Sequence, residues 1–194
     1  MPKKAVIGLK AIHMAKLTTN TAEAYASGEA FALPYAGSIS RTAKEKSQEF
    51  YYDDELYASV RDIIGEDVEL NLGELSLELI EKLGLGTLDE EKKILEADFS
   101  VPSNSEYAIR FSTPLIEGGK AYLWNYRRFV VTSVQYGNFS TKGDNITVCE
   151  PVIKGVFSRP ALSTVKAFQL TEGTDPISSS DKAFLTKAET FPGV

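Results

Sequence analysis

The residue types that most often carry out catalysis are scarce in this chain. His13 is its only histidine and Cys149 its only cysteine, which is too few for a zinc site built from those ligands. A histidine with no acid near it in the sequence is usually a structural or surface residue, and a thiol inside an apolar run, such as Cys149, is typically inert. No nucleophile, base and oxyanion donor can be assembled from the sequence, so we predict that the protein is not an enzyme.

A run of three acids, Asp53-Asp54-Glu55, is the best candidate for a metal site. Calcium loops of the EF-hand type place their acids at alternating positions and contain a glycine, whereas this triplet does neither. The glycines of the chain form neither a GxGxxG motif nor a phosphate-binding loop. We therefore predict no metal and no cofactor, and interpret the triplet as a solvated or interfacial acidic cluster.

Acidic residues are concentrated in the middle of the chain. The segment Glu49–Glu81 holds eleven carboxylates and one base, Arg61, a net charge of −10 against −6 for the whole chain. Residues 1–48 carry seven bases and three acids, and Lys120–Lys166 carry seven bases and two acids. We expect this separation to guide how copies of the chain meet, with the acidic segment of one facing the basic regions of a neighbour.

Length and composition indicate one folded domain with a real hydrophobic core. The chain has 194 residues, 43% of them hydrophobic, and its single cysteine rules out an internal disulfide. A net charge of −6 argues against binding nucleic acid through its phosphates, which needs a basic face. The start of the chain superficially resembles a signal peptide, but Lys10, His13 and Lys16 interrupt its apolar stretch. No membrane-spanning segment is predicted, and we expect synthesis in the cytoplasm.

Four elements must position the acidic segment. Gly37–Ser47 before it fits a long polar strand that needs solvent or another chain on both faces. Leu56–Ile64 has apolar residues at helical spacing and is predicted as a short helix. Asp67–Leu72 alternates between polar and apolar residues, which is typical of a half-buried strand. Leu77–Leu83 is predicted as a helix, with Ser76 as its N-cap and a left-handed glycine, Gly84, at its end.

The remainder of the chain favours strands. Ala5–Leu9 and Ala11–Leu17 are strand-like, and Thr18–Pro34 is expected to be a loop. Turns are predicted at Gly118-Gly119 and Thr141–Asp144. The later predicted strands are Lys92–Asp98, Ser105–Thr113, Lys120–Arg127, Phe129–Tyr136, Asn145–Phe157 (with a bulge or edge at Pro151) and Leu162–Leu170. Thr171–Val194 is expected to be a mobile tail with a weak helix at Ser180–Lys187. The layout predicts a mainly β fold, a β-sandwich or barrel, with one short flanking helix.

The order of several short motifs resembles the major tail proteins of long non-contractile-tailed phages, the phi13-like family. The resemblance covers roughly residues 4–160, and residues 161–194 have no clear counterpart. Two positions depart from the family pattern: Glu55 stands where glycine is usual, and Arg127-Arg128 stands where Lys-Gly is expected. The matching motifs are Gly8-Leu9-Lys10, Tyr52-Asp53-Asp54, Gly65-Glu66 leading into Val68–Leu72, the helix Leu77–Gly84, Tyr122–Tyr126, Thr141–Asp144, Pro151 and Gly155–Phe157.

This resemblance implies a tail-tube fold over residues 1–160, six-subunit rings, and stacking of rings into a hollow tube in the virion tail. Partners would be other copies of the chain and the tape-measure, tail-terminator and distal tail proteins, while viral DNA would pass without specific binding. A lumen lined by carboxylates would repel the duplex, so that DNA slides. We expect subunit-interface residues among Tyr52, Asp53, Asp54, Glu55, Arg127 and Arg128, and lumen-facing residues among Asp67, Glu69, Asn71, Ser40 and Thr42.

Two other functions remain open at this point. The first is the tube protein of a contractile injection machine, which would share the fold and add a sheath-binding outer face. The second is a monomeric β-sandwich that binds a ligand such as carbohydrate, since Tyr122, Trp124 and Tyr126 share one strand face. Core packing is the commoner reason for such an aromatic row.

Overall fold

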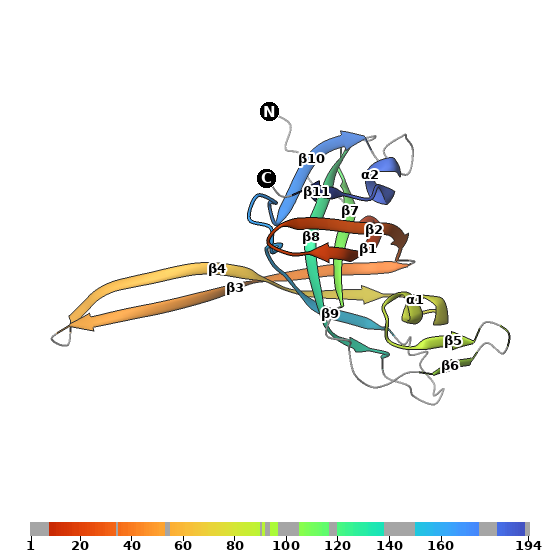
Figure 1. Ribbon diagram of the computed structural model, residues 1–194, viewed down its shortest axis with the longest axis horizontal. Helices are drawn as coiled ribbons and strands as arrows, with labels where there is room; N and C mark the ends of the chain where they lie inside the picture. The colour runs from red at the N-terminus through yellow and green to blue at the C-terminus, as the bar shows by residue number, and fades with distance from the viewer. Residues whose placement is uncertain are drawn as a thin grey trace.

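The computed structural model describes residues 8–33, 35–52, 55–89, 91, 94–96, 105–116, 120–137, 150–174 and 182–192. Strands dominate this part of the chain, with two very short helices (Figure 1). The elements are β1 (Lys10–Asn20), β2 (Ala24–Ala32), β3 (Ala36–Tyr52), β4 (Glu55–Leu72), α1 (Leu77–Lys82), β5 (Thr87–Asp89), β6 (Ile94–Glu96), β7 (Glu106–Pro114), β8 (Lys120–Gln135), β9 (Val152–Phe157), β10 (Phe168–Thr174), α2 (Lys182–Thr186) and β11 (Thr190–Pro192).

Nine of the described strands form one antiparallel sheet in the order β11-β2-β1-β7-β8-β9-β4-β3, with β10 attached to β8 as a branch. The branch arises because β8 is long enough to hold two partners on one edge. Residues 120–126 of β8 pair with β10, and residues 129–135 pair with β9. The predicted mainly β fold is confirmed. Pairing between the described strands leaves β11 and β3 as the two ends, so these strands form no closed barrel.

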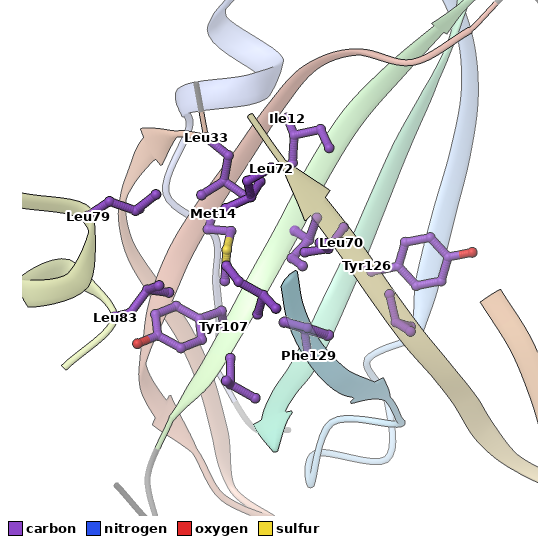
Figure 2. Close-up of a cluster of buried hydrophobic side chains, with 14 of the residues drawn as sticks. Ile12, Met14, Leu33, Leu70, Leu72, Leu79, Leu83, Tyr107, Tyr126 and Phe129 are labelled. Atoms are coloured by element: carbon purple, nitrogen blue, oxygen red, sulfur yellow. The ribbon is translucent and has the colours of Figure 1, made fainter. Parts of the chain in front are cut away.

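The hydrophobic core gathers side chains from strands that are far apart in the sheet order, such as β1 and β4. Met14 of β1 and Leu70 of β4 are both 0% exposed. Figure 2 shows them converging, with Leu79 and Leu83 reaching in from the α1 side. Fully burying one such side chain contributes about 1.5–3 kcal/mol, so this cluster is the main source of stability for the body of the protein.

The predicted central helix and its two caps are confirmed. The Ser76 hydroxyl accepts a hydrogen bond from the Leu79 N–H at 3.3 Å, which satisfies one of the free donors at the start of α1. Gly84, with φ +69°, takes the left-handed conformation that ends the helix. The helix is too short to be stable alone, and it is held by Leu79 and Leu83 in the core.

Two sequence-based predictions of local structure are wrong. Leu56–Ile64 is not a helix but part of the long strand β4, paired along its length with β3. Its β-branched residues suit a strand, and pairing with a neighbouring strand overrides a short helical spacing. Within Thr18–Pro34, expected to be a loop, Ala24–Ala32 forms β2, whose small residues pack closely against β1.

Three further segments differ from expectation in extent. Lys120–Arg127 and Phe129–Tyr136 join into the single strand β8, and the strand predicted at Leu162–Leu170 is instead Phe168–Thr174. The tail that was expected to be mobile is, over its described residues, part of the fold: α2 falls inside the predicted Ser180–Lys187 helix, and β11 pairs with β2. The turns predicted at Gly118-Gly119 and Thr141–Asp144 lie outside the described residues.

Candidate assembly surfaces

The most distinctive feature of the molecule is a long two-stranded arm. We define the arm as residues Glu45–Tyr52 of β3 and Glu55–Gly65 of β4. The strand β9 pairs with β4 only from Glu66 to Asn71, so beyond that point β3 and β4 pair only with each other within the described chain. At about 3.3 Å per residue, the eight residues on the β3 side make the arm roughly 26 Å long. Figure 1 shows it projecting away from the body.

Gly65 lies where the arm leaves the body. A side chain at this position would place its Cβ 2.4 Å from the carbonyl oxygen of Phe157, the last residue of β9. The register of the β3–β4 ladder also shifts here, between Lys44 and Glu45. The glycine therefore lets β4 pass close to the end of β9 and continue outward, which positions everything on the arm.

The arm exposes large apolar side chains. Phe50 is 40% exposed, Tyr51 59%, Ile63 61% and Ile64 46%. A two-stranded hairpin without a third strand or a covering layer is only marginally stable in water. The arm also leaves the whole outer edge of β3 without a sheet neighbour among the described strands, and such an edge is a template for pairing with another chain. Both features fit a surface that is covered by a partner.

The five residues predicted to face a lumen do lie together. We call Ser40, Thr42, Asp67, Glu69 and Asn71 the polar face. Ser40 pairs with Glu69 across the β3–β4 ladder, and Thr42 pairs with Asp67, so these side chains occupy one side of the sheet. Most of them line a hollow of about 420 Å³, which Thr132 and Lys154 complete.

Both carboxylates of the polar face have a lysine partner. The Lys44 Nζ lies 3.4 Å from an oxygen of Asp67, and the Lys154 Nζ lies 2.8 Å from an oxygen of Glu69. These pairs are substantially exposed, so each contributes little to stability, but together they balance the charge of the face. Repulsion of DNA by bare carboxylates, expected from the sequence, is therefore not a property of this face in the isolated subunit.

The six predicted interface residues are placed in two different environments. Tyr52 and Glu55 are paired at the end of the arm, and Asp53 and Asp54 lie outside the described residues. Arg127 instead lies in the body and is 8% exposed, with its guanidinium donating to Glu189, Gln169 and the Lys166 carbonyl. Its role in the structure is internal, because it joins β8 to the C-terminal segment.

Arg128 also makes its contacts within the chain. It donates to Glu106 at 2.7 Å and to the Arg159 carbonyl at 3.1 Å. Burial raises the pKa of Glu106, but hydrogen bonds from Arg128 and Asn20 lower it, and the net pKa is below the usual range. This cluster ties the start of β7 to the chain that follows β9.

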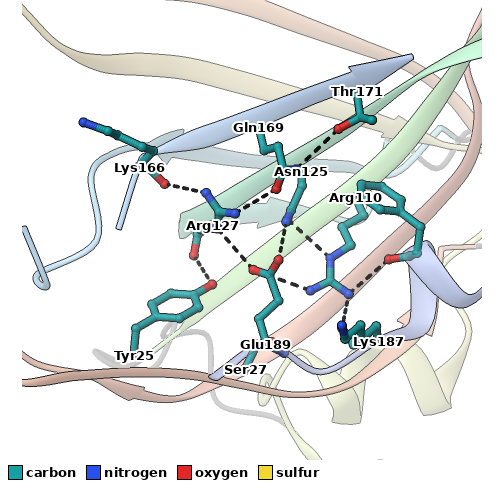
Figure 3. Close-up of polar contacts among 11 residues, drawn as sticks. Tyr25, Ser27, Arg110, Asn125, Arg127, Lys166, Gln169, Thr171, Lys187 and Glu189 are labelled. Atoms are coloured by element: carbon teal, nitrogen blue, oxygen red, sulfur yellow. Dashed lines mark hydrogen bonds and ion pairs between the residues drawn. The ribbon is translucent and has the colours of Figure 1, made fainter. Parts of the chain in front are cut away.

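A buried ionic network that the sequence did not reveal holds the C-terminal segment on the sheet (Figure 3). Glu189 bonds to Asn125 at 2.8 Å and to Arg127 at 3.2 Å. Arg110, 2% exposed, lies 3.8 Å from the same carboxylate and donates to carbonyls at the end of α2. Burial lowers the pKa of Arg110, and the Glu189 charge partly offsets this effect. The available sequence signal was Arg110, a charged residue at a strand position between Ile109 and Phe111.

No family model matches this chain, and a search of curated proteins finds no significant match. Within the described ranges, no helix is long and apolar enough to cross a membrane. Nor does that part of the chain contain a cluster of three or more residues that could hold a metal ion. The arm and the polar face are the features of the described chain that bear on function.

Proposed function

We propose that this protein is a structural subunit of a hollow tube, the major tail protein of a virion with a long non-contractile tail. Copies associate into rings, expected to be hexameric, and the rings stack into a tube that conducts the genome during ejection. The arm is the observation that carries this proposal. It exposes apolar side chains and a free strand edge far from the body, which a monomer would leave in water.

A second copy of the chain is the favoured partner for the arm because assembly then needs only one kind of subunit. We place the receiving surface on a different part of the chain, and such a contact is head-to-tail when it repeats in one direction from copy to copy. Contacts of this type close into rings or continue as helical filaments, and both are compatible with a tube. The resemblance to phage tail proteins selects the tube among these outcomes, and implies contacts with tape-measure, terminator and distal tail proteins.

The polar face is the best candidate for the lumen wall. It presents hydroxyls, an amide and lysine-paired carboxylates, with no excess of cations to hold DNA phosphates. Passage of DNA without specific binding fits such a surface. Charge balance, rather than repulsion, is the property that we assign to it.

Two alternatives are less well supported. A monomeric carbohydrate-binding module would need the aromatic row of β8 to be open, yet Tyr126 is 3% exposed and Arg41 lies over the Trp124 ring at 4.9 Å. The tube of a contractile injection machine would share the present fold, and it would differ by binding a sheath. No feature of the described chain favours a sheath over bare solvent on the outer surface.

Negative-stain electron microscopy of the purified protein tests the proposal. We expect rings or tubes for the natural sequence. Replacing Ile63 and Ile64 with serine should leave a folded monomer that no longer assembles, because the apolar surface of the arm is lost. The matched control is Ile94→Ser on β6, which removes an apolar side chain of similar exposure away from the arm and should assemble normally. A natural protein that stays monomeric at high concentration would contradict the proposal.

A further inference from the structure

The β8–β10 branch carries an aromatic patch, and two of its three side chains are exposed to solvent. We define the patch as Trp124, Phe168 and Leu170. Phe168 is 50% exposed and Leu170 44%, while Trp124 is half-buried between them and the base of the arm. The ladder between β8 and β10 pairs Leu170 with Trp124, so the three side chains occupy one face of the branch. Contiguous exposed apolar surface of this kind usually marks an interaction site.

The patch is rigid, which suits it to receive a partner. Ring stacking holds Phe168 against Tyr126, with the centroids 5.5 Å apart, and Tyr126 stacks in turn on Phe157 at 3.9 Å. The Arg41 guanidinium lies over both Trp124 and Tyr126. Little side-chain entropy would be lost when this surface is covered, because its rings are already fixed.

We propose that the aromatic patch of one copy is the docking surface for the arm of the next. The arm offers four large exposed apolar side chains on its two strands: Phe50 and Tyr51 on β3, and Ile63 and Ile64 on β4. This inference rests on the proposed function, since it identifies where successive subunits meet.

Charge complementarity supports this pairing. In the sequence, the segment Glu49–Glu55 contains four acids, two of them (Asp53 and Asp54) outside the described residues. The strand β10 has a base near each end: Lys166, exposed, precedes it, and Lys120 pairs with its last residue, Thr174. Glu172 within the strand carries one negative charge, so these three residues sum to +1. This small positive charge favours the approach of an acidic arm, and the apolar contact supplies most of the affinity.

The geometry of this contact arranges the arms in series. Arg41 belongs to β3, where the strand approaches the arm, and its guanidinium lies 4.9 Å from the centre of the Trp124 ring. An arm docked on the patch would therefore end beside the base of the receiving copy's own arm. Repeated in one direction from copy to copy, this step produces an open or closed head-to-tail array.

Mixed cross-linking tests the inference. Two chains are prepared in a Cys149→Ser background, one with Ile63→Cys and the other with Leu170→Cys, and are co-assembled and treated with a short thiol cross-linker. We expect a mixed covalent dimer in the assembled fraction, several-fold more abundant than when Ile63→Cys is paired with Ile94→Cys. If the chains assemble but the mixed covalent dimer is no more abundant than in this control, the docking surface is wrong and the tube proposal still stands. Failure of the natural chain to form rings or tubes overturns both.

A single-chain variant gives a second readout. Leu170→Lys should abolish assembly, whereas Thr171→Lys, one position along the same strand and also exposed, should assemble as the natural chain does. Thermal unfolding of both variants shows whether the body is intact. If a folded Leu170→Lys protein assembles normally, the patch is not the docking surface. If Leu170→Lys does not fold, the cross-linking result decides.

Discussion

Gly155 is packed so closely that no side chain fits at its position without a shift of its neighbours. A Cβ at this position would lie 2.4 Å from the Val130 carbonyl oxygen and 2.5 Å from the ring of Phe129, which is 0% exposed and cannot move. We expect Gly155→Ala to lower the free energy of unfolding by about 1–3 kcal/mol through overpacking. Gly37→Ala is the control, because its nearest neighbour is at an ordinary 3.7 Å. Equal urea midpoints for the two variants would show that β8 and β9 can separate without cost.

Tyr107 makes stability depend on pH in the alkaline range. Burial raises the pKa of its hydroxyl to about 12. The unfolded chain loses this proton near pH ~10 while the folded chain keeps it, so the stabilising contribution is present below that pH and disappears as pH rises toward the folded value. Tyr107→Phe should reduce the alkaline loss of stability, measured by urea unfolding at stepped pH. Part of the loss should remain, because burial also raises the pKa of Tyr25. An unchanged slope in the variant would contradict this assignment.

At the residue scale, local signals were predictable from sequence and long-range partners were not. Ser76 and Gly84 were identified because a cap depends on neighbours within a few positions. The pairing of Glu189 with Arg110 and Arg127 joins residues more than sixty positions apart. Nothing in their spacing indicates contact, since it depends on how the strands are ordered. Arg127 is predicted from sequence as a subunit-interface residue, whereas its contacts lie within the chain.

At the scale of elements, the α1 helix depends on its cap. The helix has six residues, and the Ser76 hydroxyl satisfies one of the N–H groups left free at its start. We expect Ser76→Ala to lower the free energy of unfolding by about 1 kcal/mol. Ser59→Ala, on an exposed position of the arm, is the matched control and should change stability by less than about 0.5 kcal/mol. A similar effect for both serines would mean that packing of Leu79 and Leu83 alone determines the helix.

The elements that were wrongly predicted share a physical cause. Leu56–Ile64 shows helical spacing of apolar residues, yet in the arm those residues have no body to face, so the spacing carries no information about burial. The loop predicted over Thr18–Pro34 contains small and polar residues that a strand tolerates when it packs closely on a neighbour, as β2 does on β1. In contrast, Asp67–Leu72 is correctly predicted as a strand because one of its faces is buried in the core and the other faces solvent.

The charge pattern has a clear arrangement at the scale of the whole molecule. On the polar face, acids from the middle of the chain are neutralised by Lys44 and Lys154 of the same subunit. The arm projects away from the body and carries Glu49 and Asp62 among its described residues (Figure 1). Asp53 and Asp54 join its two strands in the sequence and lie outside the described residues. In the proposed tube, these acids would meet a neighbouring copy.

Reversing two of these charges tests their role in assembly. We expect Asp53→Lys combined with Asp54→Lys to slow assembly and to weaken its dependence on salt, because the arm end would no longer be attracted to the lysines around β10. Light scattering at several ionic strengths measures both effects. Glu23→Lys combined with Glu29→Lys, at exposed positions before and within β2, changes the net charge equally and should affect the rate less. Assembly of the arm variant at the natural rate, with the natural salt dependence, would show that apolar contact alone directs the arm to its site.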